Sequence, residues 1–591
     1  MTSDLPGERL DQVRPSGAVI ETLRGLGEAA TRHFPMPGGV IAIVDRDGLL
    51  AETSFGHADL ERGTPMTPGY RFEIGSISKV MTSLLVNQLA EEGQLGLDEV
   101  VTDLLPWVDL GPRGRSITVT QLLTHTAGLV LGSDALPDEA AQVWAARQLV
   151  TAPCGAARFH YSNLGYLLLG ELVRARTGQR LPDLVRDRLL APLGMAGAIA
   201  EVTHADRSTL APGYWPTRPD RPWAPGDPLS PAPWFEVATA DGNVAATGRD
   251  MGRLVMALIG GDDHDPVGAR EGRPVIAADV LDRMITTLAP GGEPVVPPDG
   301  LPPVEDSRYG MGINVERIGG HLCLTHGGGM VGYSTFVLAD RTAGVGIVVL
   351  TNANGDCLAA QLLARAGHAD LVGRPAGGRT PPMPDLDPTV RGLPGGADPC
   401  GAGGLGRFVP EGGGPPLEVD APGPGVPVRV RLSGDVGHLY RLPAGRFVTD
   451  HPRLRRFHLD LWAAPEGSCW THGDQVFRRP GMGGHPARGA GPVGTAPATP
   501  GDDPLVGHYR SYSPWYPELR IIRRTGRLLL VAPGGVEASG EEEELVEVSA
   551  GVLRIGADPW LPERLVVGPV VNGRVISVDR DGCRYSRAFT P

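Results

Sequence analysis

The chain has 591 residues, more than one hydrophobic core normally serves, so we expect one domain of catalytic size and one or two smaller ones. Hydrophobic residues make up 41% and charged residues 21%, which predicts a folded protein. The net charge of −14 argues against nucleic acid or an anionic membrane surface as partners. We find neither a signal-peptide core nor an apolar run of about 18 residues, and we therefore expect a cytoplasmic protein that does not enter a membrane.

The first two thirds of the chain combine strand and helix patterns. A hairpin is predicted over 39–56, and a helix over 77–92 stops at Gly93. Further helices are predicted at 120–123, 163–177, 181–190, 250–259 and 357–366, and strands at 319–325, 333–338 and 344–350. Strands at both ends with helices between them predict an α+β domain with a helical insertion, which we place at residues 1–372.

The last third is rich in glycine and proline and reads as small β modules. We predict a linker at 373–427 that has room for one short strand, a β module at 428–480, a second linker at 481–503 and a second β module at 504–591. Our hypothesis is that these modules cover the mouth of a site or join copies of the chain as a homo-oligomer. The aromatic cluster Tyr509, Tyr512, Trp515 and Tyr516 is either exposed for this purpose or forms the core of its own module.

Lys79 is the only lysine among 54 basic residues. Arginine stays protonated, whereas a buried lysine can become a neutral amine and act as a base. Lys79 follows Ser76 by three residues, so on a helix the amine and the hydroxyl share a face. A serine hydroxyl becomes a good nucleophile when a neighbouring base takes its proton, and a helix start favours the negative charge that develops. The alternative is a surface lysine on an ordinary helix.

Four segments together resemble the SxxK serine hydrolases of the β-lactamase and penicillin-binding-protein fold, most closely the branch with class C β-lactamases, D-aminopeptidases and esterases. They are Gly75-Ser76-Ile77-Ser78-Lys79, the stretch 117–129 with Leu122-Leu123-Thr124-His125-Thr126-Ala127-Gly128-Leu129, Tyr161-Ser162-Asn163, and His326-Gly327-Gly328-Gly329. The resemblance covers about residues 16–370. It implies an antiparallel sheet flanked by helices, with the two β modules following.

The resemblance also implies a role for each matching residue. Ser76 would be the acylated nucleophile and Lys79 its activating partner. Tyr161 would pass the proton to the leaving group and help to activate water or another acceptor, since a phenol near a cation ionises more readily. Asn163 would bind the substrate or hold Lys79, and His326 would orient Tyr161 and the substrate from a strand edge.

The oxyanion hole implied by the resemblance consists of the backbone N–H groups of Ser76 and Gly329. One such donor is typically worth about 2.7–4 kcal/mol in the transition state. Gly327 and Gly328 leave the backbone bare, so a ligand can approach it closely. His326 stands where many members carry lysine, and a ring that can be neutral favours an esterase, peptidase or acyl-transfer member over an efficient β-lactamase.

Several of these residues have simpler interpretations. Tyr161 could be a packing aromatic, and Asn163 could cap the helix that follows it. We interpret His125 and His160 as structural, and we assign His321 to a strand. The six cysteines form no CxxC pair and the 15 histidines show no His-x-x-x-His spacing, so we predict no metal and no cofactor.

The function favoured by the sequence is a serine hydrolase that forms an acyl-enzyme with an ester, an amide or a small peptide. The nearest alternative is an acyltransferase or peptide-cyclising thioesterase that uses the same acyl-enzyme. A second alternative is a non-catalytic binding protein on the same fold. Residues 203–238, with Trp215, Trp223 and Trp234, are predicted to form a lid or a pocket wall.

Overall fold

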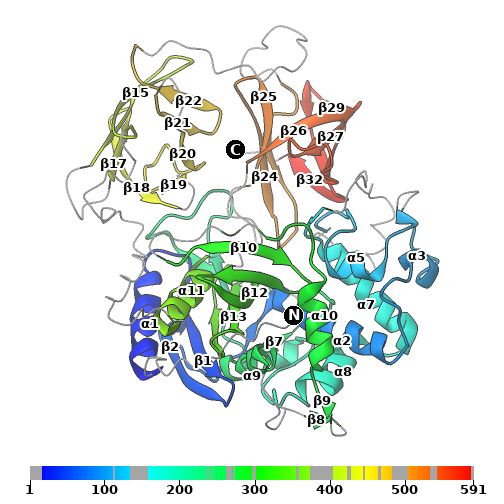
Figure 1. Ribbon diagram of the computed structural model, residues 1–591. Coiled ribbons are helices and arrows are strands. Elements are labelled where there is room, and N and C mark those ends of the chain that lie inside the picture. The colour runs from blue at the N-terminus through cyan, green and yellow to red at the C-terminus, as the bar shows by residue number, and fades with distance from the viewer. Residues whose placement is uncertain are drawn as a thin grey trace, which may run out of the picture.

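The fold is described from a computed structural model. It describes residues 16–110, 114–132, 158–234, 236, 238–242, 244–260, 269–270, 273–293, 295, 301–354, 358–372, 403–421, 428–442, 446–462, 467–481, 503–532 and 542–587. Two closed β-barrels lie beside each other above a larger N-terminal domain, residues 16–372 (Figure 1).

The N-terminal domain is built on an eight-stranded antiparallel sheet in the order β10-β11-β12-β13-β14-β1-β2-β3. The hairpin from the chain start, β1 and β2, pairs with the last strand of the domain, because β1 lies beside β14 from Gly39–Thr351 to Asp45–Val345. This confirms the predicted hairpin, the three later strands and the α+β class. The strands are β1 (Gly38–Asp45), β2 (Leu49–Asp59), β3 (Thr64–Pro65), β10 (Val304–Tyr309), β11 (Asn314–Ile318), β12 (His321–Met330), β13 (Tyr333–Asp340) and β14 (Val345–Thr351).

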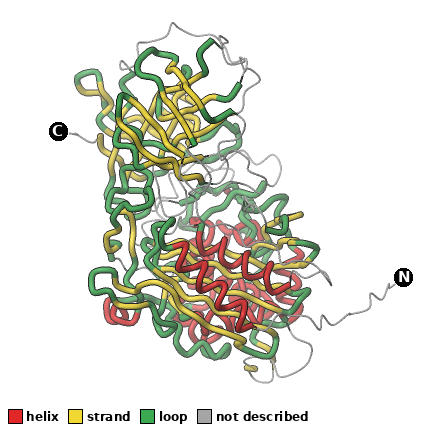
Figure 2. The backbone as a smooth tube through the Cα atoms, turned by 90° about the vertical axis from the view of Figure 1, so that its left-hand side faces the viewer, coloured by secondary structure: helices red, strands yellow, loops and turns green. Residues whose placement is uncertain are grey.

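Both faces of the sheet are buried, and alternate residues of β1 serve the two cores. Ile41 and Ile43 belong to the core under α1 (Ser16–Ala30) and α11 (Ala359–Val372), whereas Val40 and Val44 belong to the core shared with α9 (Gly248–Ile259) and the other helices. Figure 2 shows the helices stacked against the sheet. α11 begins and ends later than the predicted 357–366, and part of that range lies outside the described residues.

The helical insertion supplies the second layer. α2 (Ser78–Glu91) is its central helix and is buried on almost every side, including polar side chains such as Thr82, Ser83 and Asn87. Around it lie α3 (Val101–Leu104), α5 (Val119–Leu123), α7 (Asn163–Thr177), α8 (Leu181–Val185), a π-helical turn over Arg186–Leu190, a 3₁₀ turn over His204–Thr209 and α10 (Ala278–Thr286). Short pairs complete the domain: β4 (Phe72–Glu73) with β7 (Ala245–Ala246), β5 (Tyr214–Pro216) with β6 (Leu229–Pro231), and β8 (Ala269–Arg270) with β9 (Arg273–Pro274).

Each barrel has eight strands and its own core. The first holds Phe408, Phe447 and Trp470, and the second holds Tyr509 and Tyr585. The first barrel comprises β15 (Gly406–Pro410), β16 (Leu417–Asp420), β17 (Val428–Leu432), β18 (Asp435–Arg441), β19 (Arg446–Thr449), β20 (Leu459–Trp462), β21 (Cys469–His472) and β22 (Gln475–Arg478). The second comprises β23 (Gly507–Arg510), β24 (Glu518–Arg524), β25 (Arg527–Val531), β26 (Glu542–Ser549), β27 (Val552–Ile555), β28 (Arg564–Val567), β31 (Ser577–Arg580) and β32 (Cys583–Arg587), with a hairpin of β29 (Val570–Val571) and β30 (Arg574–Val575).

Two expectations about this part of the chain were wrong in detail. The first two strands of the first barrel, β15 and β16, lie inside the predicted linker 373–427, because short alternating runs such as Leu417–Val419 are hidden among glycines and prolines. The aromatic cluster does not act as a unit. Tyr509 is in the barrel core, Tyr512 is fully exposed, and Trp515 packs against the core of the N-terminal domain.

Among the described residues, no helix combines the length and the apolarity that crossing a bilayer requires.

Candidate active site

Ser76 and Lys79 meet at the start of the central helix. Ser76 lies in a 3₁₀ turn over Gly75–Ile77 that runs directly into α2, and Lys79 is in the first turn of α2. Lys79 is completely buried, and its Nζ donates to Ser76 Oγ over 2.8 Å and to the carbonyl of Asp241 over 3.0 Å. The only lysine of the chain thus has its amine against a serine hydroxyl at a helix start, as the spacing predicted.

The glycines after His326 bring strand β12 against the backbone that precedes Ser76. Gly75 has a φ of +53°, and a Cβ there would lie 2.5 Å from the carbonyl oxygen and 2.7 Å from the nitrogen of Gly329. A Cβ on Gly328 would collide with the carbonyl of Ile74, whereas one on Gly327 would meet only Phe336 at 3.8 Å. Gly75 and Gly328 are therefore required by close backbone approach. The backbone of Gly329 lies beside that of Gly75, directly before Ser76.

Tyr161 precedes α7 and lies over the amine, with Lys79 Nζ 5.1 Å from the centroid of its ring. The neighbouring aromatic ring is that of His125, whose centroid is 4.3 Å from that of Tyr161. His125 Nδ1 accepts the backbone N–H of Ser162 over 3.1 Å, so the ring also fixes the chain around Tyr161. Burial, followed by the charges of Lys79 and His326, lowers the pKa of His125 well below its usual value. A neutral His125 is thus a packing and positioning group for Tyr161.

Asn163 is buried as the first residue of α7, but it does not cap the helix. The cap is Ser162, whose Oγ accepts the N–H of Gly165 over 3.0 Å and donates to the carbonyl of Val130 over 2.6 Å. The capping alternative for Asn163 is therefore wrong by one residue, because Ser162 has the extended backbone that a cap requires.

His326 lies in β12 and contacts Tyr309. Its Nε2 accepts the Tyr309 hydroxyl over 2.9 Å, and its Nδ1 donates to the carbonyl of Gly327 over 2.6 Å. The ring is fully buried, and burial lowers the pKa of His326 to about 3. Tyr309 is edge-on to Tyr161, with ring centroids 6.2 Å apart. His326 and Tyr161 thus both contact Tyr309, and the expectation that His326 orients Tyr161 stays a prediction.

The second barrel reaches this region through Glu563. Its Oε1 accepts a hydrogen bond from His160 Nε2 over 2.6 Å and another from the backbone N–H of Leu131 over 3.2 Å. Trp560, three residues earlier, is edge-on to His160 and stacks on the guanidinium of Arg158 at 5.4 Å. Burial raises the pKa of Glu563, but the hydrogen bond from His160, the charge of His160 and two backbone N–H donors together outweigh burial, so the pKa is lowered. Because His160 directly precedes Tyr161, the barrel helps to position the site.

The tryptophan-rich region predicted as a lid lines a cavity of about 480 Å³ through Trp234 and Tyr214, but Trp215 and Trp223 are not among its walls. Ser76 and Lys79 are not among them either. Glu73 does line the cavity, and burial raises the pKa of its carboxyl group to about 8. Both barrels hold this region, since Arg520 donates to the carbonyl of Asp220 and Arg455 pairs with Asp227.

Sequence reasoning missed three contributors to the site. Tyr309 showed no motif, because it stands alone before a Gly-Met-Gly turn and reaches the site only through the sheet. Asp241 contributes its carbonyl, which no side-chain pattern reveals. Glu293 lies close enough for the charge of Lys79 to lower its pKa, although burial, the larger effect, leaves that pKa raised. The positive φ of His125, +54°, matches its place in a tight turn of the recognised segment.

Comparison with known proteins gives a consistent result. The Beta-lactamase family model matches residues 28–369. Penicillin-binding protein 4 of Amycolatopsis lactamdurans is 35% identical over 172 residues, which are 28% of this chain and 45% of that protein. The D-aminopeptidase of Brucella anthropi is 33% identical over 183 residues, 29% of this chain and 35% of that protein. The chain thus matches less than half the length of either relative.

Among solved structures, the octameric penicillin-binding protein homologue from Pyrococcus abyssi superposes with a TM-score of 0.54. The match covers 78% of this chain and 99% of that one, at 22% sequence identity. At this identity the likeness concerns the fold.

Proposed function

The chain belongs to the β-lactamase family, and on this premise we propose that it is a serine hydrolase that forms an acyl-enzyme on Ser76 with an ester, an amide or a small peptide. The observation that carries the proposal is the 2.8 Å contact between Lys79 Nζ and Ser76 Oγ, with the amine completely buried beside the ring of Tyr161.

In the first step, Ser76 Oγ attacks the substrate carbonyl carbon while its proton passes to Lys79, which must be a neutral amine at that moment. The carbonyl oxygen becomes an oxyanion, which the backbone N–H groups of Ser76 and Gly329 would stabilise. The tight approach of Gly75 to Gly329 supports this role, since it brings the two backbone segments together.

In the second step, the bond to the leaving group breaks and the leaving atom takes a proton through Tyr161. The acyl group stays on Ser76 Oγ as an ester. In the third step, Lys79 takes a proton from water through Tyr161, and the water oxygen attacks the ester carbonyl carbon. The bond between that carbon and Ser76 Oγ then breaks, Oγ takes the proton back from Lys79, and the acid is released. Ring contacts from His125 and Tyr309 support this use of Tyr161, because a proton carrier must be held in one place.

The third motif supports a proposal for the substrate class. His326 stands where many family members have lysine, and its ring is neutral, buried and bonded to Tyr309. It therefore offers no fixed cation for a substrate carboxylate, which favours esters and amides without a carboxylate at that place over penicillins. The 33% identity to a D-aminopeptidase supports amides of amino acids as the first compounds to test.

The second barrel would limit substrate size, since Glu563 closes against His160 and Leu131 beside the site. Assembly of copies through the barrels also stays a proposal. Light scattering on the purified chain measures its oligomeric state, and a monomeric mass would refute this proposal.

Intact-mass detection of covalent adducts tests the function. Small esters, D-amino-acid amides, thioesters and penicillins are offered to the wild-type chain and to Ser76→Ala. Added amines or alcohols distinguish hydrolysis from acyl transfer, because transfer yields the coupled product instead of the acid. A fluorophosphonate probe that fails to label folded wild type, or labels Ser76→Ala equally, would favour a binding protein.

A further inference from the structure

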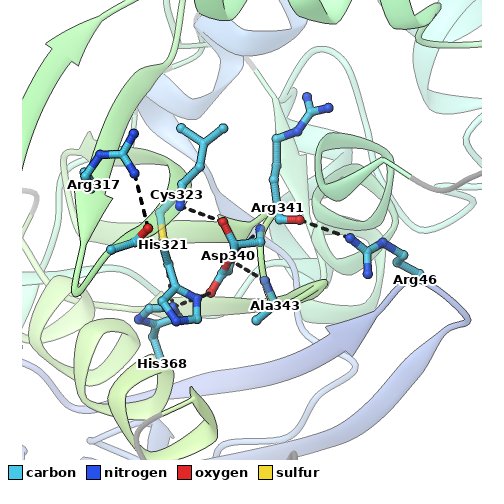
Figure 3. Close-up of polar contacts among 11 residues, drawn as sticks. Arg46, Arg317, His321, Cys323, Asp340, Arg341, Ala343 and His368 are labelled. Atoms are coloured by element: carbon cyan, nitrogen blue, oxygen red, sulfur yellow. Dashed lines mark hydrogen bonds and ion pairs between the residues drawn. The ribbon is translucent and has the colours of Figure 1, made fainter. Parts of the chain in front are cut away.

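A second cluster of reactive side chains lies on the other face of the sheet from Ser76. His321 Nδ1 and His368 Nε2 each lie 2.8 Å from the same oxygen, Asp340 Oδ2 (Figure 3). His321 comes from β12, Asp340 from the end of β13 and His368 from α11. The three ligand-capable atoms lie within 4.8 Å of one another.

Cys323 lies at the edge of this cluster, outside the three atoms that lie within 4.8 Å of one another. It lies two residues after His321 on β12 and therefore on the same face, and it stands directly opposite Asp340 in the strand pairing. Its Sγ is 3.8 Å from His368 Nε2, and its side chain is completely buried. Leu324, the next residue, belongs to the opposite core that contains α2.

The central carboxylate is held in a fixed direction. Asp340 Oδ1 accepts the backbone N–H groups of Thr342 and Ala343, each over 2.8 Å, in the turn after β13. Its other oxygen is thereby aimed at the two imidazoles. Backbone contacts that orient a ligating carboxylate are what metal sites use to fix their ligands.

We propose that His321, Cys323, Asp340 and His368 form a binding site for a zinc-type divalent cation that fastens α11 to strands β12 and β13. Two imidazoles, a thiolate and a carboxylate are the donors that zinc takes in proteins, whereas calcium and magnesium prefer oxygen alone. One thiolate and one carboxylate also balance the two charges of the cation, so the buried complex is neutral and its desolvation is inexpensive.

The distances fit this assignment when the Cys323 side chain moves toward the other donors, because its Sγ is not among the three atoms that lie within 4.8 Å of one another. Around a tetrahedral zinc, two nitrogen or oxygen ligands lie about 3.3 Å apart, and a nitrogen and a sulfur about 3.6 Å apart. The observed separations are 2.8 Å for the two nitrogen–oxygen pairs and 3.8 Å for the nitrogen–sulfur pair. His321 has 19% of its side chain exposed and provides the entrance, whereas Asp340 and His368 are buried.

Binding has a definite proton balance. Without a cation, the two imidazole nitrogens that face Asp340 Oδ2 carry the hydrogens of those bonds. On binding, each ring gives up that hydrogen and binds the cation as a neutral imidazole with a hydrogen on its other nitrogen, the Cys323 thiol releases one proton to solvent, and four bonds to the cation form. No oxidant or reductant is involved.

The test titrates zinc into tag-free, chelator-treated full-length chain and measures metal stoichiometry, thermal midpoint and the absorption spectrum with cobalt. We expect one saturable zinc per chain, a thermal midpoint that rises with the logarithm of free zinc, and a cobalt–thiolate band in the near ultraviolet. Cys323→Ala should abolish that band, and Cys323→Ala and His321→Gln should each weaken binding at least about 100-fold.

Two matched controls should bind zinc like the wild type. Ser76→Ala removes the proposed nucleophile and so separates this site from the proposed function. His438→Asn removes another His–Asp pair, 2.9 Å from Asp450 in the first barrel. The ligand variants should stay folded, because Arg365 holds α11 to the sheet independently through its 2.9 Å ion pair with Glu316. Absence of saturable zinc binding in the wild type, or unchanged binding in both ligand variants, would overturn the proposal.

Discussion

Truncating Glu563 tests whether the second barrel holds part of the candidate active site in place. Glu563→Ala removes the acceptor of two hydrogen bonds, one from the His160 ring and one from the backbone of Leu131. Both side chains of the His160–Glu563 pair are largely buried, with 16% and 11% exposed, so solvent replaces little of what is lost.

The expected magnitude follows from these two contacts. A hydrogen bond to a charged group contributes about 1.5–3 kcal/mol and a neutral one about 1 kcal/mol. Removing both should cost about 2.5–4 kcal/mol of the free energy that holds residues 556–563 on the N-terminal domain. Since 1.4 kcal/mol is a tenfold change, the detached population should rise about 60- to 700-fold. His160 directly precedes Tyr161, so loosening it should lower kcat/KM for a small ester about 10- to 100-fold.

Hydrogen exchange and steady-state kinetics measure the two effects. Peptides that cover 128–132, 158–163 and 556–563 should exchange faster in Glu563→Ala, and strand β24 should not. Glu518→Ala is the matched control, because Glu518 also pairs with a histidine, His508, but inside the barrel. Unchanged exchange at 158–163 together with unchanged kcat/KM would refute the idea that the barrel positions Tyr161.

Three further predictions concern the buried groups. Lys79→Arg keeps the charge but gives up the removable proton, so the acylation rate in the folded protein should fall by about 10⁴-fold, measured as the burst of leaving group. Tyr309→Phe leaves His326 Nε2 as a buried acceptor without its donor, which should lower the free energy of unfolding in urea by about 1–3 kcal/mol. Burial lowers the pKa of His458 to about 3 and of His472 to about 4, so only the unfolded chain binds these protons near pH 5. The first barrel should therefore lose stability as the pH falls from about 6.5 towards 4, by up to about 2.7 kcal/mol per pH unit, seen as faster exchange in β20 and β21 after correction for intrinsic rates.

A specific result would contradict each of these three predictions. Full acylation by Lys79→Arg would exclude the amine as the base. An unchanged free energy of unfolding in Tyr309→Phe would mean that the hydroxyl contributes nothing to the fold. Equal protection of β20 and β21 at pH 7 and pH 5 would show that the two histidines do not stay neutral in the folded barrel.

The parts of the fold that sequence could predict are those with local periodicity. The helix from Ser78 and the strands around His326 carry continuous patterns, and the contact between Ser76 and Lys79 follows from a spacing of three on a helix. The strands around Leu417 could not be recognised, because they are only four or five residues long and lie between glycines and prolines.

Contacts between distant elements were out of reach for a physical reason. Tyr309 meets His326 through the pairing of strands, and Glu563 meets His160 across 403 residues of chain. No single motif encodes either contact, since each depends on how a whole strand or barrel is placed. For the same reason, the spacing of histidines along the chain could not bring His321 and His368 together.

The central claim is that Ser76 becomes acylated. Incubation with an activated small ester, rapid acid quenching and intact mass measurement test it directly, with peptide mapping to locate the added group. We predict a mass increase equal to one acyl group on the peptide that contains Ser76, and none in Ser76→Ala. A folded wild-type chain that gains no acyl group from any substrate class, or an adduct that persists in Ser76→Ala, would contradict the account.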